Sequence, residues 1–86
     1  DAERVPEADP KSALQQYTQW HSGSLPEYRI VDAAGPVHAR TFTAEVSVDG
    51  SVLGRGSGPS KQAAEKAAAA DALAVLQARR EGAAGV

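Results

Sequence analysis

The sequence predicts an α+β domain of two layers, in which two helices pack on one face of a three-stranded antiparallel sheet (order α-β-β-β-α). Helical patterns lie near both ends of the chain, residues 40–48 alternate as a strand does, and Asp49-Gly50 is a strong tight-turn signal. The second face of such a sheet stays open to water. With 86 residues and no cysteine, we expect one small domain without disulfides or a cysteine-based zinc site.

The first predicted helix begins at Asp9, a good N-cap, with Pro10 in the first helical position. It should run to about Trp20 and stop near Gly23. Its outer face carries a polar but uncharged stripe at positions i, i+3, i+4 and i+7, which are Ser12, Gln15, Gln16 and Gln19. Taken alone, such a stripe is typical of an ordinary solvated helix face.

Three strands are predicted at roughly 27–33, 40–48 and 51–56. In the second strand the apolar side chains that point one way are Phe42, Ala44, Val46 and Val48. The segment Gly35-Pro36-Val37-His38 is too long for a two-residue hairpin turn, so it should form a protruding loop. His38 on its own indicates only an exposed loop histidine.

The second predicted helix follows Ser60, whose residue type predicts an N-cap, and runs to about Arg80. Its many alanines favour a helix that lies close to the sheet. The preceding loop, 56–61, has two glycines and ends in Ser60 and Lys61. Backbone N–H groups, the helix dipole and Lys61 would suit a phosphate there, although many glycine-rich loops before helices bind nothing. The spacing matches neither a P-loop nor a dinucleotide-binding motif.

Charge divides the chain into parts. Residues 1–9 have a net charge of −3 and residues 10–80 a net charge of +2, while the whole chain has −2. We expect a flexible acidic linker at 1–8, a folded domain at 9–80 and a disordered tail at 81–86. No apolar run reaches membrane-spanning length and no signal-peptide pattern opens the chain, so we expect a cytoplasmic location and no membrane partner. No residues form a catalytic or metal-ligating pattern.

Four segments together resemble a double-stranded-RNA-binding domain (dsRBD), and more narrowly the C-terminal domain of bacterial ribonuclease III. They are DPKSALQQYTQ at 9–19, LPEYRI at 25–30, GPVHARTFTAEV at 35–46 and LGRGSGPSKQAAEKAAAADAL at 53–73. Each is weak alone, but all four occur in the order and spacing of the family.

The resemblance implies three RNA contacts that together read A-form shape over about 16 base pairs. The helical stripe of Ser12, Gln15, Gln16 and Gln19 would enter one minor groove, and the loop with Gly35, Pro36 and His38 would enter the next. The phosphates of the major groove between them would be bound by Ser60, Lys61 and Lys66. Gln62 and Glu65 stand where many members carry basic residues, so we expect weak binding, with Arg55 and Lys66 compensating in part.

The resemblance also implies a role. This chain would hold double-stranded RNA, such as a precursor of ribosomal RNA, for ribonuclease III, a Mg²⁺-dependent endoribonuclease. The acidic signature of the nuclease domain is absent from the sequence, so we expect neither cleavage nor a cofactor in this chain, and Mg²⁺ only in the nuclease domain. The isolated domain should be a monomer, and the parent enzyme a homodimer. The alternative is a degenerate domain of the same fold that acts as a protein–protein interaction module.

Overall fold

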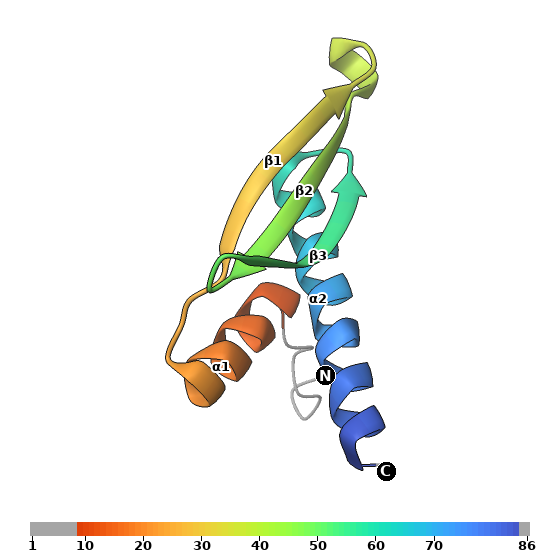
Figure 1. Ribbon diagram of the computed structural model, residues 1–86. Coiled ribbons are helices and arrows are strands. Elements are labelled where there is room, and N and C mark those ends of the chain that lie inside the picture. Colours follow the sequence, from red (N-terminus) through yellow and green to blue (C-terminus); the bar gives the residue numbers. More distant parts are fainter. Residues whose placement is uncertain (1–8, 85–86) are drawn as a thin grey trace, which may run out of the picture.

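The computed structural model describes residues 9–84, and the predicted linker at 1–8 lies outside them. The elements follow the predicted order (Figure 1). They are α1 (Pro10–Ser22), β1 (Glu27–Ala34), a short 3-10 turn η1 (Val37–Ala39), β2 (Thr41–Val48), β3 (Ser51–Gly58) and α2 (Lys61–Ala84). The predicted α-β-β-β-α fold is therefore confirmed. No helix in this part of the chain is long and apolar enough to cross a membrane.

The three strands form one antiparallel sheet in the order β1-β2-β3. The tight turn between β2 and β3 has φ of 54° at Asp49 and 83° at Gly50, which is the left-handed backbone that a two-residue hairpin turn requires. Strand β1 carries an irregularity between Ile30 and Asp32, where its register against β2 shifts by one residue.

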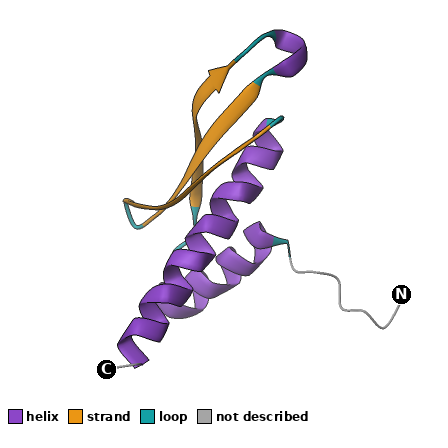
Figure 2. Cartoon of the chain, turned by 90° about the vertical axis from the view of Figure 1, so that its right-hand side faces the viewer, coloured by secondary structure: helices purple, strands orange, loops and turns teal. Residues whose placement is uncertain are grey.

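Both helices lie on the same side of the sheet (Figure 2). Helix α2 packs across β3 and β2, and α1 packs alongside α2. The core between the layers is built from small side chains and two larger ones, and its fully buried members are Leu14, Ala44, Val46, Ala64, Ala68, Ala69 and Ala72. Alanine lets the backbone of α2 approach the sheet closely, as the sequence predicted.

The glycines before α2 have a different role from the predicted one. Gly56 and Gly58 belong to β3, which runs two residues further than expected, so they do not form a loop around a phosphate. Together with Gly54 they face α2, and a Cβ atom added at any of the three would lie less than 3.0 Å from an atom of an alanine of that helix. These glycines are therefore needed for close contact between strand and helix.

The helix ends differ in part from prediction. Asp9 occupies the N-cap position of α1, but its side chain caps no backbone N–H group. Gly23 ends α1 with φ of 75°, and its N–H donates to the Gln19 and Thr18 carbonyls. Helix α2 runs to Ala84 instead of about Arg80, so residues 81–84 continue the helix and are no tail. The alanines there favour helix, and one interior glycine costs only about 1 kcal/mol.

Candidate nucleic-acid interface

The predicted stripe on α1 forms an exposed polar surface. Its side chains all point away from the core, and they are Ser12, Gln15, Gln16 and Gln19. The inward face of the helix carries Leu14, which is fully buried, and Thr18, which is 4% exposed. The buried Thr18 hydroxyl donates a hydrogen bond to the carbonyl of Gln15, 3.3 Å away, so it needs no partner from the sheet. The four side chains of the stripe are therefore exposed and can contact a ligand.

The predicted loop forms the tip of the β1–β2 hairpin, which projects well beyond the two helices (Figure 1). Gly35, Pro36 and His38 are all exposed there. Gly35 has φ of 95°, and a Cβ at this position would lie 2.9 Å from the carbonyl oxygen of Ala39. The Ala39 N–H donates to the Pro36 carbonyl at 2.9 Å and closes the turn. Glycine at position 35 therefore shapes the tip.

The N-terminus of α2 is capped by Ser60 and, within residues 9–84, leaves two backbone N–H groups without a partner. The Ser60 hydroxyl accepts a hydrogen bond from the Ala63 N–H at 3.0 Å, which confirms Ser60 as the N-cap. The Ala64 N–H donates to the Ser60 carbonyl at 2.9 Å. Among the described residues, the N–H groups of Lys61 and Gln62 have no such partner, so they remain for an anion.

Lys61 adds an exposed positive charge at the same helix end. Within residues 9–84, no carboxylate lies within ion-pair distance of its ammonium group. The charge of Lys61 is therefore not offset by a partner in this part of the chain.

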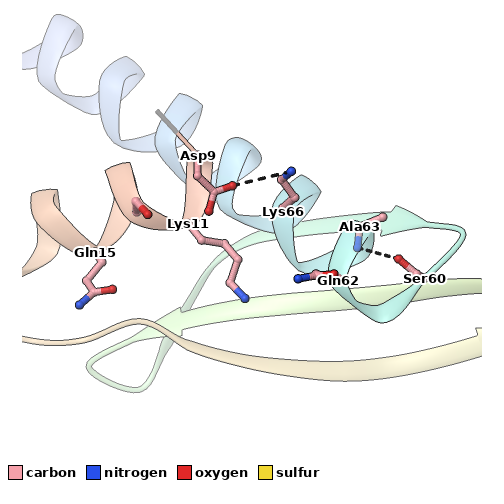
Figure 3. A pocket seen from close by; sticks show the side chains of 8 residues that line it. Asp9, Lys11, Gln15, Ser60, Gln62, Ala63 and Lys66 are labelled. Atoms are coloured by element: carbon pink, nitrogen blue, oxygen red, sulfur yellow. Dashed lines mark hydrogen bonds and ion pairs between the residues drawn. The ribbon is translucent and has the colours of Figure 1, made fainter. Parts of the chain in front are cut away.

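A surface groove joins the α1 stripe to the start of α2 (Figure 3). The residues that line it are Asp9, Lys11, Ser12, Gln15, Ser60, Gln62, Ala63 and Lys66. It brings together four of the predicted RNA-contacting residues. Lys61, Gln16 and Gln19 lie outside the groove, and the three residues of the hairpin tip form a separate site.

Two lysines at this groove are paired with carboxylates. The Lys11 ammonium lies 2.7 Å from a Glu65 carboxylate oxygen, and the Lys66 ammonium lies 3.9 Å from Asp9 Oδ1. The second pair is visible in Figure 3. Glu65, predicted to weaken RNA binding, thus connects α2 to α1. Lys11 was missed as a groove residue because nothing in the sequence pairs it with a position 54 residues away.

Tyr28 lies beneath the Lys11–Glu65 pair. The Lys11 ammonium is 4.8 Å from the centre of the Tyr28 ring, a distance suited to a cation–π contact. Burial, with smaller contributions from the charges of Glu65 and Asp9, raises the pKa of Tyr28 to about 12. The phenol is therefore neutral at pH 7. Its hydroxyl is buried without a hydrogen-bond partner in the described residues.

Arg55 does not join this surface, contrary to the expectation that it compensates for Gln62. Its neighbours Gly54 and Gly56 face α2, so its own side chain points to the open face of the sheet. There its guanidinium lies 3.9 Å from Glu45. Because alternate residues of a strand point to opposite faces, Arg55 lies on the other side of the sheet from the helices.

Replacing Asp9 by asparagine should strengthen RNA binding about two- to threefold, since an exposed ion pair is worth up to about 1 kcal/mol. The change frees Lys66 and removes a negative charge from the groove. Glu45→Gln makes the same charge change on the open face and serves as the control. Fluorescence anisotropy with a duplex RNA measures both variants. Equal affinities for the two would mean that the Asp9–Lys66 pair does not restrain binding.

Comparisons with known proteins identify the family of this chain. The family described as double-stranded RNA binding motif matches residues 10–76. Ribonuclease 3 of Bacillus licheniformis is 51% identical over 69 residues, covering 80% of this chain and 28% of the relative. Ribonuclease 3 of Caulobacter vibrioides is 52% identical over 61 residues, covering 71% of this chain and 26% of the relative.

A solved structure of Dicer from Pichia stipitis superposes with a TM-score of 0.63 and 34% sequence identity, covering 76% of this chain and 31% of the Dicer chain. The chain spans little more than a quarter of the length of the two ribonuclease 3 relatives. In residues 9–84 no three potential metal ligands cluster. The match over 10–76 shows that the chain belongs to the double-stranded RNA binding motif family, and within it the chain is similar to ribonuclease 3.

Proposed function

We propose that this domain binds double-stranded RNA by its A-form shape. The observation that carries the proposal is the order of three exposed regions along the length of the molecule. In both Figure 1 and Figure 2 the start of α2 lies between α1 and the tip of the β1–β2 hairpin. A duplex has the same order of features, because two minor grooves flank one major groove.

Each region carries side chains suited to its place. The serine and glutamine side chains of α1 donate and accept hydrogen bonds, which suits 2′-hydroxyls and base edges in the wide minor groove of A-form RNA. Lys61 and the two free N–H groups at the start of α2 suit phosphate oxygens. His38 at the hairpin tip can donate or accept a hydrogen bond in the second minor groove.

Binding should be weak and its salt dependence shallow. Each phosphate that is neutralised contributes roughly one unit to the slope of log affinity against log salt. Lys11 and Lys66 are already paired with carboxylates, and Arg55 lies on the other face. Lys61 is therefore the main source of phosphate attraction, and affinity should fall less steeply with salt than in more basic members of the family.

We further propose that the chain is the substrate-holding part of a ribonuclease III. The identity to ribonuclease 3 over about a quarter of those relatives supports this role. Cleavage, and the Mg²⁺ that it uses, would then belong to a nuclease domain outside this chain. Precursors of ribosomal RNA in the cytoplasm are the proposed substrates, and the isolated domain is proposed to be a monomer.

Fluorescence anisotropy tests the proposed binding directly. The chain is titrated at about 50 mM salt, where phosphate contacts are strong, against a duplex RNA longer than the footprint of about 16 base pairs. The same sequence as duplex DNA and as single-stranded RNA provides the controls. We expect saturable binding to duplex RNA alone. Equal binding to all three, or none, would instead favour a protein–protein interaction module.

Replacing both Gln15 and Gln19 with alanine should erode the preference for duplex RNA over duplex DNA. The amides are proposed to bond the 2′-hydroxyl, which DNA lacks, so affinity for RNA should fall about thirtyfold, at roughly 1 kcal/mol for each of the two lost hydrogen bonds. Affinity for DNA should change little. A constant ratio of the two affinities would show that these side chains do not contact the minor groove.

A further inference from the structure

The last turns of α1 carry a cluster of aromatic rings that the proposed duplex contacts do not use. The rings of Tyr17 and His21 stack with centroids 4.2 Å apart, and Trp20 meets His21 edge-on at 6.0 Å. Tyr17, Trp20 and His21 line a surface groove together with Leu76 and Arg79 of α2. The groove therefore combines three rings, one apolar side chain and one positive charge.

The exposure of Trp20 in this groove calls for an explanation. Its side chain is 87% exposed, and it is the single tryptophan of the chain. A lone exposed apolar residue is ordinary. Here, however, the largest side chain of the protein lies in water beside two other rings and Arg79. Aromatic faces next to arginine are typical of sites where unpaired nucleobases stack.

The position of the cluster favours RNA as its occupant. Trp20 follows Gln19 directly and lies one helical turn after Gln16, so it borders the polar stripe. In Figures 1 and 2 the C-terminal end of α1 is the end farther from the hairpin tip. If a duplex is bound at the α1 stripe, a single-stranded extension from its end would therefore reach Trp20. Arg79 could contact the phosphate of such a nucleotide.

We propose that Trp20, with His21 and Arg79, binds an unpaired nucleotide next to the duplex by stacking on its base. This inference rests on the proposed function, because the duplex must first be held by α1, α2 and the hairpin tip. It adds a selectivity that A-form shape does not provide. The domain would prefer duplexes that end in a single-stranded extension over blunt ones.

Tryptophan fluorescence and anisotropy together test the inference. Three duplexes of one sequence are compared: blunt, with short adenine extensions at both ends, and with abasic extensions of equal length. The adenine extensions should quench Trp20 fluorescence and bind about three- to tenfold tighter than the blunt duplex, since stacking is worth about 1–3 kcal/mol per base. The abasic extensions should do neither, because they carry phosphates without bases.

Variants separate stacking from general effects. Trp20→Ala should reduce the ratio of extended to blunt affinity to about one, while Trp20→Phe keeps a ring and should retain part of it. Val52→Ala, at an exposed apolar residue on β3, should keep the full ratio. If duplex RNA binds but all three duplexes bind alike with unchanged fluorescence, the inference is wrong and the proposed function stands. If no duplex binds, both are wrong.

Discussion

Replacing Gly56 by alanine is expected to destabilise the domain by about 3 kcal/mol, at the upper end of what overpacking a core costs. The added methyl group would lie less than 3.0 Å from backbone atoms of Ala67 and Ala68. Backbone cannot rotate away as a side chain can, so β3 and α2 must separate. For a domain of this size the melting temperature should fall by about 15 °C, measured by circular dichroism.

Ser57→Ala provides the matched control for Gly56→Ala. It lies next to Gly56 on the same strand, but its side chain is exposed. Its effect should stay within about 0.5 kcal/mol, as for most surface changes. If Gly56→Ala has the same melting temperature as Ser57→Ala, the close contact between β3 and α2 does not exist as described.

Lys61→Ala is expected to weaken binding to duplex RNA several-fold at about 50 mM salt and to reduce the salt slope by about one unit, as for the loss of one phosphate contact. The side chain is exposed at the first position of α2, so folding should be unaffected. Anisotropy titrations at several salt concentrations measure both quantities.

Arg29→Ala removes the same charge from the open face of the sheet and controls for net charge. Arg29 lies between Tyr28 and Ile30, which pack on the core, so its own side chain points away from the helices. Its loss should leave the salt slope unchanged. An unchanged affinity in Lys61→Ala would remove the start of α2 from the proposed RNA surface.

The sequence predicted the elements well because they follow local rules. Helical spacing, the alternation of β2, the Asp49-Gly50 turn and the Ser60 cap each depend on neighbouring residues. The end of α2 was placed too early, at about Arg80, because residues 81–86 were expected to form a tail, although Gly82 costs the helix only about 1 kcal/mol. Continuing alanines outweigh that cost.

The predictions from the sequence failed where residues that are far apart along the chain come into contact in the fold. Gly54, Gly56 and Gly58 look like loop residues until α2 is placed against them. Asp9 looks like a cap, but its carboxylate faces Lys66 instead. Lys11 and Glu65 become partners only once α1 and α2 pack together. The glycine stretch at 56–58 thus positions the start of α2, where phosphate binding is proposed, and is not itself the proposed site.

The net negative charge of the chain is compatible with an RNA-binding surface. Four of the acidic residues lie in residues 1–9, and Glu45 faces the open side of the sheet. Asp9 does line the groove, where it pairs with Lys66, and Glu65 pairs with the groove residue Lys11. Net charge alone therefore understates the capacity of the start of α2 to bind phosphate.

Amide chemical shifts of the ¹⁵N-labelled domain, recorded with and without a duplex RNA of about 20 base pairs, slightly longer than the family footprint, test the central claim most directly. The account predicts shifts in three separate regions at once: the outer face of α1, the hairpin tip around His38, and the first turn of α2 at Lys61. Arg29, Glu45 and Arg55 on the open face of the sheet should not shift. Shifts confined to that open face would contradict the account.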